Sequence, residues 1–186
     1  MIFESYYWKK DLLKIARKLS KRKTLVIWTD VDFGEFEKEI MFGFYIIRKL
    51  ADARKLSSST MSNKLDARKI PNNGKIVHLM NHHRYWEFYD FEKAVVTKLD
   101  IKFLLNQIVH SYVFSPYFSE NENNCLEGIH FTSDKNRNEW LYELNIDIII
   151  ASFKDVGNDY PWDITLSFDT NKKDYTFKST DLPPKK

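Results

Sequence analysis

The segment 33–54 constrains the fold most, because its apolar residues recur at the spacing of an α-helix. Its expected buried face consists of Phe36, Ile40, Gly43, Phe44, Ile47, Leu50 and Ala51. Met41, Phe42 and Tyr45 extend the apolar surface around most of the helix at mid-length. A helix that is apolar nearly all round is typical of the centre of a bundle. We therefore expect this helix to form the core.

Three further segments predict long helices. In segment 5–20, Trp8, Leu12, Ile15 and Leu19 form one apolar stripe, and the cations fall mostly on the other side. Segment 101–112 follows a candidate cap at Asp100, and we expect Ser115-Pro116 to end its helix. Segment 146–156 has the pattern of a fourth helix, which Gly157-Asn158 would end.

Short strand-like runs lie between these helices and predict three hairpins. The expected pairs are 67–70 with 75–79 across Asn73-Gly74, 129–132 with 139–144, and 164–168 with 175–178. Helices mixed with antiparallel pieces predict an α+β fold with a core of about four helices flanked by short antiparallel β-hairpins. We expect one domain over 1–180, a polar loop at 120–124 and a flexible C-terminal tail at 181–186.

The composition and the apolar runs indicate in which compartment the protein resides and exclude some kinds of site. Cys125 is the only cysteine, so neither an intrachain disulfide nor a cysteine-based zinc site can form. The longest apolar run, Ile40–Ile47, is far shorter than the roughly 20 residues of a membrane-spanning helix. The N-terminus lacks the pattern of a secretory signal. These features predict a cytoplasmic protein with no membrane segment.

The charge is distributed unevenly along the chain. Residues 1–69 carry 16 Lys and Arg against 9 Asp and Glu, a net charge of +7, whereas the remainder carries −4. Much of the excess lies between Lys9 and Lys23. Such a basic helix predicts a binding or regulatory protein that engages RNA, DNA or an acidic partner. The residues expected to bind nucleic acid are Lys14, Arg17, Lys18, Lys21 and Arg22. The alternative is a solvated helix face with no ligand.

A second pattern lies in the third long helix. Asn106 and His110 are four residues apart, so both project from one side of the helix, and Tyr112 follows two residues later. This motif resembles that of the HEPN superfamily, helical-bundle proteins of bacterial toxin–antitoxin and defence systems, many of which are metal-independent ribonucleases. In that family an arginine precedes the asparagine, and here Leu105 stands in its place.

The resemblance implies that His110 takes part in proton transfer and that Asn106 orients the phosphate or the imidazole. Because Leu105 replaces the motif arginine, another cation such as Arg48 or Arg54 would have to take its place. The alternative interpretation is that Asn106 and His110 form a satisfied polar pair on a packing surface.

The remaining candidates carry weaker signals. His78 and His82 have the spacing of helical metal ligands, but Asn73-Gly74 favours a strand at His78, which would separate them, so we expect no metal and no cofactor. The aromatic run 85–91 could stack bases but is more typical of core. Without a complete catalytic set, a non-enzymatic role is favoured. A structural or homodimeric protein that associates through the apolar region Phe36–Ile47 is the third possibility.

Overall fold

A computed structural model describes residues 2–119, 125–171 and 173–180. The predicted loop at 120–124 and the predicted tail at 181–186 lie outside the described residues. The helices are α1 (Ser5–Arg22), α2 (Asp30–Asp52), α3 (Ser58–Ser62), α4 (Ile101–Val109) and α5 (Ile146–Asn158), with two 3-10 turns, η1 (His82–Glu87) and η2 (Phe91–Lys93). The strands are β1 (Lys64–Pro71), β2 (Val95–Asp100), β3 (Ser111–Phe118), β4 (Leu126–Ser133), β5 (Trp140–Asn145), β6 (Trp162–Asp169) and β7 (Asp174–Thr180).

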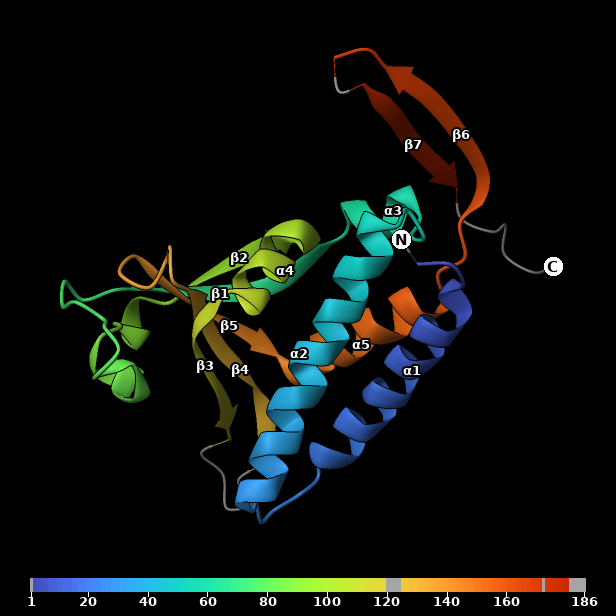
Figure 1. Ribbon diagram of the computed structural model, residues 1–186. Helices are drawn as coiled ribbons and strands as arrows, with labels where there is room; N and C mark the ends of the chain where they lie inside the picture. Colours follow the sequence, from blue (N-terminus) through green and yellow to red (C-terminus); the bar gives the residue numbers. More distant parts are fainter. Residues whose placement is uncertain (1, 120–124, 172, 181–186) are drawn as a thin grey trace.

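Five strands form one antiparallel sheet in the order β2-β1-β5-β4-β3. β1 pairs with β2 on one side and with β5 on the other, so the sheet joins segments far apart in the sequence. Helices α1, α2, α4 and α5 lie together beside the sheet (Figure 1). The mixture of helices and antiparallel strands confirms the α+β class. The core, however, is shared between the helices and one sheet, and the expected set of helices with separate hairpins is wrong in this respect.

The main core is built from the stripes that the periodicity predicted. Leu12, Leu19, Phe36, Phe44 and Phe153 are completely inaccessible to solvent, and they pack with Ile129 and Phe131 of β4. A smaller apolar cluster lies on the other side of the sheet, where Ile70 and Leu141 meet Phe88 and Tyr89. The aromatic run 85–91 therefore contributes mainly to core, as its pattern suggested.

Several expected boundaries are wrong, each for a local reason. α2 begins earlier than predicted, because Thr29 and Asp32 form a reciprocal capping box. α4 ends at Val109, so His110 is its C-cap and Tyr112 belongs to β3. Pro116 lies within β3, where a proline is tolerated because β3 is an edge strand of the sheet.

The first expected hairpin does not form. Segment 64–71 is a strand, but its partners are β2 and β5 and not the run 75–79. The Asn72 side chain accepts from the Gly74 N–H and donates to the Lys75 carbonyl, which shapes a local turn. The other two predicted hairpins are present, as β4–β5 and as β6–β7.

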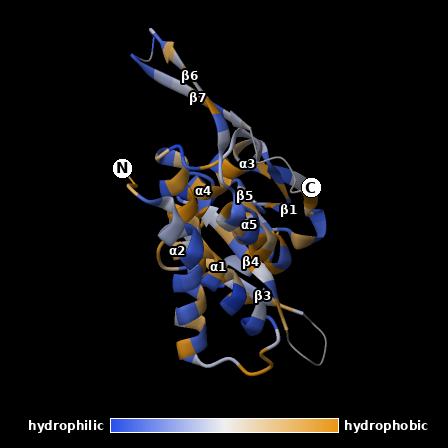
Figure 2. Ribbon diagram, turned by 90° about the vertical axis from the view of Figure 1, so that its right-hand side faces the viewer, coloured by the Kyte–Doolittle hydropathy of each residue, from blue (hydrophilic) through white to orange (hydrophobic). Residues whose placement is uncertain are grey.

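The β6–β7 hairpin, which we call the arm, projects from the rest of the molecule in both ribbon views (Figures 1 and 2). It forms a two-stranded sheet of its own and pairs with no strand of the main sheet. No helix within the described ranges is long and apolar enough to cross a membrane.

Candidate nucleic-acid interface

Four of the five predicted nucleic-acid-binding cations are exposed on α1. Lys14, Arg17, Lys18 and Lys21 all lie on the solvent side of the helix. At about 100° per residue, they fall within one outward arc roughly 100° wide. The opposite arc carries the buried apolar residues. The basic face that the sequence predicted therefore exists as a continuous strip along α1.

Arg22 has a different environment. Its side chain is only 16% exposed, and its guanidinium donates to Glu39 at 2.8 Å and to Asp32 at 3.1 Å. The hydrogen bond to Glu39 is the main cause that raises the pKa of Arg22. Since the Glu39 carboxylate is itself buried, Arg22 is the closest cation that compensates its charge. Arg22 thus ties the end of α1 to α2.

Two exposed cations of the strip form ion pairs. Lys14 lies 2.7 Å from Asp11, and both side chains are exposed, so this pair contributes about 0–1 kcal/mol. Lys18, itself more than half exposed, lies 3.3 Å from the buried Glu39, which Arg22 approaches more closely. Arg17 and Lys21 have no ion pair with any described residue. A phosphate could therefore compete for Lys14, Arg17 and Lys21 at little cost.

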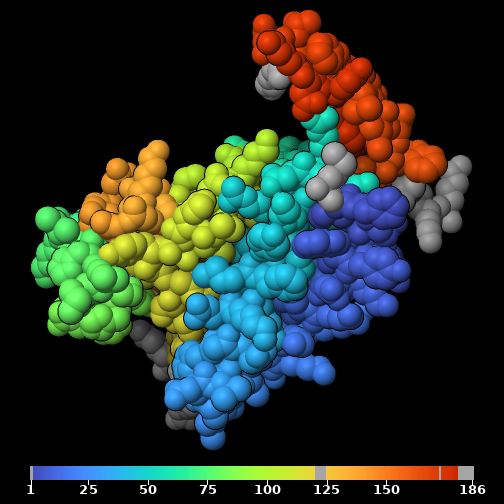
Figure 3. Space-filling model, in the orientation of Figure 1, coloured from blue at the N-terminus to red at the C-terminus, as the bar shows by residue number. Residues whose placement is uncertain are grey.

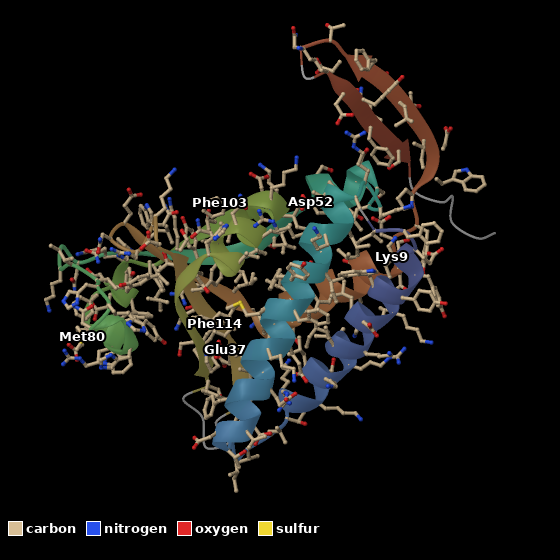
Figure 4. All side chains as sticks on the ribbon, in the orientation of Figure 1. Lys9, Glu37, Asp52, Met80, Phe103 and Phe114 are labelled. Atoms are coloured by element: carbon tan, nitrogen blue, oxygen red, sulfur yellow. The ribbon has the colours of Figure 1, made fainter. Side chains whose placement is uncertain are left out.

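Lys9, from the same basic run, is not part of this strip. It is fully buried, its Nζ donates to the Asp159 carbonyl, and it lies 4.3 Å from the centroid of the Tyr160 ring. Figure 4 labels Lys9 near the N-terminal end of α1. Burial lowers its pKa, although the nearby Asp159 carboxylate partly opposes this. Lys9 joins α1 to the segment after α5.

Next to the basic strip, α2 presents two aromatic rings to solvent. Phe42 and Tyr45 are 47% and 43% exposed, and their rings stack with centroids 6.5 Å apart and an interplanar angle of 15°. With Lys38, Met41 and Val109 they line a shallow apolar hollow of about 370 Å³. The expectation that apolar residues all round α2 place it at the centre of a bundle is wrong at these positions. Figure 3 shows α1 and α2 side by side on one face of the molecule.

The basic strip and the aromatic hollow are adjacent. A second depression between α1 and α2 is lined by Lys14, Lys18, Lys38 and Phe42, and also by the carboxylates that pair with these lysines, Asp11, Glu35 and Glu39. Lys38 and Phe42 line both hollows. The cations of α1 and the rings of α2 therefore belong to one surface.

Beyond the rings, Arg48 lies almost one turn further along α2 and lines a hollow of about 490 Å³. Lys102 and Asn106 of α4 line the same hollow, and Asp52, labelled in Figure 4, lies on its wall. Nη1 of Arg48 is buried and has no hydrogen-bond partner among the described residues. Buried donors usually have an acceptor, so this hollow is suited to an anionic, acceptor-rich ligand.

Asn106 and His110 come together at a further hollow of about 530 Å³, which Phe103 and Lys135 also line. Both residues are exposed. The His110 backbone N–H donates to the Asn106 carbonyl at 3.1 Å, and the two side chains make no hydrogen bond to each other. Asn106 borders both this hollow and the Arg48 hollow. Arg48 thus lies near the predicted pair, whereas Arg54 forms an ion pair with Asp174.

A buried polar network supports the His110 hollow from below. Gln107 donates to Asn136 at 2.8 Å and accepts from the Ser133 N–H at 3.0 Å. Gln107 and Ser133 are both buried. This network joins the turn between β4 and β5 to α4 at the wall of the hollow.

A hydrogen-bonded chain around His130, on the opposite side of the sheet, was not predicted from the sequence. His130 is 7% exposed, its Nδ1 lies 3.0 Å from the Tyr85 hydroxyl, and its Nε2 lies 3.3 Å from Glu143. Arg68 donates to the same carboxylate at 3.0 Å. Burial raises the pKa of Glu143, but the His130 hydrogen bond and the Arg68 charge outweigh it, so the pKa is lowered. The alternation of side chains along β4 could have predicted that His130 and Phe131 lie on different faces of the sheet. No nearby residue in the sequence, however, identifies Tyr85 as the partner of His130.

The described residues contain no group of three or more His, Cys, Asp or Glu that could hold a metal ion. His78 is not in a strand, contrary to our expectation, because the chain turns there and the His82 N–H donates to the His78 carbonyl. The His78 and His82 ring nitrogens lie instead against backbone groups of Met80 and Leu79.

Comparison of the chain with protein-family models, with curated proteins and with solved structures finds no match. The function is therefore inferred from the geometry of this surface alone.

Proposed function

We propose that this protein binds single-stranded nucleic acid on the face formed by α1, α2 and α4. The observation that carries the proposal is the exposed, stacked pair Phe42 and Tyr45, which lies between the α1 cations and Arg48. Proteins that bind single strands combine a basic path for the phosphates with aromatic rings on which unpaired bases stack. A duplex would hide its base faces from these rings. RNA and DNA share this chemistry, so both are candidate ligands.

The phosphate contacts in this proposal come from Lys14, Arg17, Lys18 and Lys21, with Arg48 and Lys102 beyond the rings. Arg22 is left out of the set, although the sequence pattern included it, because it compensates the buried Glu39 carboxylate. An Arg22→Ala variant would lose folding stability for a reason unrelated to ligand binding. The variants below therefore retain Arg22.

The salt dependence of binding tests the basic strip. In Lys14→Ala/Arg17→Ala/Lys18→Ala/Lys21→Ala, the plot of log affinity against log salt concentration should become flatter, by roughly 0.7 for each phosphate of a single strand that the variant no longer neutralises. The matched control removes the same charge from exposed sites elsewhere, as Lys64→Ala/Lys75→Ala/Lys93→Ala/Lys98→Ala, and should keep the wild-type slope. A wild type that fails to bind even at low salt, or equal slopes in both quadruple variants, would contradict the proposal.

Removal of the aromatic pair should change the affinity and not its salt dependence. Phe42→Ala/Tyr45→Ala should weaken binding, since base stacking on an aromatic side chain is worth about 1–3 kcal/mol per base, while the salt slope stays unchanged. Fluorescence anisotropy of a labelled oligonucleotide measures both quantities. Unchanged affinity in this double variant would show that the rings serve another purpose. One such purpose is the protein partner or homodimer expected for Phe36–Ile47, and the mass in solution would reveal it.

A divergent HEPN-like ribonuclease is the second candidate. The observation that favours it is that Arg48 and Asn106 line one hollow, so a cation is available where Leu105 replaces the motif arginine. In this proposal His110 acts as general acid or base and Asn106 orients the phosphate. His110→Ala should then abolish RNA cleavage without lowering the unfolding temperature, whereas His83→Ala, at another exposed histidine, should cleave like the wild type. Equal cleavage by both variants would remove this candidate.

A further inference from the structure

The arm carries a row of apolar side chains that the rest of the molecule leaves exposed. Ile164, Leu166, Phe168 and Tyr175 are each between 51% and 56% exposed. Phe177, in the middle of β7, lines the Arg48 hollow of the body. An isolated two-stranded hairpin is at best marginally stable in water, so an additional layer on this face would stabilise it.

The register shows that the arm is amphipathic. Leu166 lies opposite Phe177, and Phe168 lies opposite Tyr175, so these four residues share one face, which Ile164 extends. We call these five residues the apolar face of the arm. The other face is polar and consists of Thr165, Ser167, Asp169, Asp174, Thr176 and Lys178. This strict alternation is typical of a strand pair that is buried on one side.

The base of the arm is fixed to the body. Ser58 and Ser179 exchange hydrogen bonds, at 3.2 Å from the Ser58 N–H and at 3.0 Å from the Ser179 N–H. At the other end of the arm, beside its turn, Asp174 forms an ion pair with Arg54, whose positive φ of 56° turns the chain after α2. The arm is thus held at both ends while it projects from the body (Figures 1 and 2). Of its apolar face, Phe177 lines the Arg48 hollow, and the other four side chains stay about half exposed.

We propose that the apolar face of the arm binds the same face of a second copy of this chain, which makes the protein a homodimer. The area supports this choice. Ile164, Leu166, Phe168 and Tyr175 are each about half exposed. With an aromatic side chain at about 200 Å² and the aliphatic ones somewhat smaller, they offer at most roughly 400 Å² of apolar surface per copy, or about 800 Å² per pair. Such a contact also buries polar atoms at its rim, so its total area would exceed this apolar area. It would come near the lower end of the range of about 1,200–2,000 Å² of stable complexes.

The chemistry of the face also fits a second copy. None of its five residues is charged, so two identical faces meet without like-charge repulsion, as a two-fold interface requires. Two amphipathic hairpins packed face to face would form a small sandwich with the polar faces outside. Phe177 lines the hollow that holds Arg48 and Lys102, whereas Leu166 and Phe168 do not, so variants of Leu166 and Phe168 test dimerisation apart from nucleic-acid binding.

Sedimentation equilibrium over the micromolar to hundred-micromolar range tests the dimer. The mass of the wild type should rise from 22.3 kDa toward twice that value with concentration. Leu166→Lys should raise the dimer dissociation constant roughly 100-fold or more, because two like charges would meet inside the interface. The matched control Ser167→Lys adds the same charge to the polar face of the same strand and should dimerise like the wild type.

Phe168→Ser is a second, uncharged variant, and circular dichroism checks that both arm variants keep the wild-type helix content. A wild type that stays monomeric throughout the range would overturn the proposal, whether or not it binds lipid vesicles or a helical peptide. Dimerisation of Leu166→Lys with wild-type affinity would also overturn it. Phe42→Ala/Tyr45→Ala should remain dimeric. If this variant is instead monomeric, the dimer interface lies on α2 and not on the arm.

Discussion

At the scale of single residues, burial decides which cations of the basic run can meet a ligand. Lys9, Lys14 and Arg22 look equivalent in the sequence, yet only Lys14 is exposed. Lys9 is enclosed between α1 and the segment after α5, and Arg22 is enclosed between α1 and α2. The period of the helix predicted an outward basic arc, but the contacts that enclose Lys9 and Arg22 come from residues far along the chain.

Lys9→Met tests the burial of Lys9 through the pH dependence of stability. Because the folded state lowers the pKa of Lys9 below its usual 10.5, the unfolded state binds more protons between the two pKa values. The free energy of unfolding contributed by this site therefore rises with pH across that interval, by about 1.4 kcal/mol for each unit of pKa difference. Urea denaturation of the wild type and of Lys9→Met over alkaline pH measures the difference.

The exposed neighbour supplies the control for this experiment. Lys10→Met removes the same charge from an exposed position and should leave the pH profile of the wild type unchanged. If the profile of Lys9→Met runs parallel to that of the wild type, then Lys9 does not have the lowered pKa that its burial implies.

At the scale of elements, periodicity predicted the helices but not the sheet. The apolar stripes in 5–20 and 33–54 lead directly to α1 and α2, since a stripe and a cap are local properties. The pairing of β1 with β2 and β5 depends on contacts across dozens of residues, and no local signal encodes it. The Asn73-Gly74 pair accordingly suggested a hairpin that does not form.

The candidate site likewise has residues that the sequence could predict and residues that it could not. The outward direction of Lys14, Arg17, Lys18, Lys21 and Asn106 could be predicted from the sequence, because they lie on helix positions away from the apolar stripe, and His110 follows as the C-cap of α4. The exposure of Phe42 and Tyr45 does not follow, because an apolar residue on a helix predicts burial, and only the packed structure shows which side of α2 is left uncovered.

Gly43→Ala tests the close contact between α2 and α5. A Cβ atom at Gly43 would lie 2.2 Å from Cε2 of the buried Phe153 ring, so the ring or the helix must move. We expect overpacking to cost about 1–3 kcal/mol, of which the better helix propensity of alanine restores about 1 kcal/mol. Urea denaturation measures the net loss.

Gly34 offers a matched control within the same helix. Nothing lies within 4 Å of a Cβ atom at that position, so Gly34→Ala should be neutral or stabilising by up to about 1 kcal/mol. Equal stability of the two variants would contradict the close approach of α2 to Phe153.

At the scale of the whole molecule, function is assigned to two surfaces that lie on different elements. The face of α1, α2 and α4 combines cations, stacked rings and hollows, and the arm presents an uncharged apolar face. A dimer formed through the arms would bring two such basic faces into one assembly, and linked sites raise the apparent affinity for a long strand. The arm variants would then weaken binding to long oligonucleotides more than to short ones.

The most direct test of the proposed interface is to locate the bases of a bound strand. An oligonucleotide that carries photoreactive thiouracil bases should cross-link to the α2 peptide that contains Phe42 and Tyr45, and mass spectrometry of the digested complex identifies that peptide. Cross-links confined to segment 85–91 or to the far side of the sheet would contradict the assignment of the nucleic-acid interface to α1, α2 and α4.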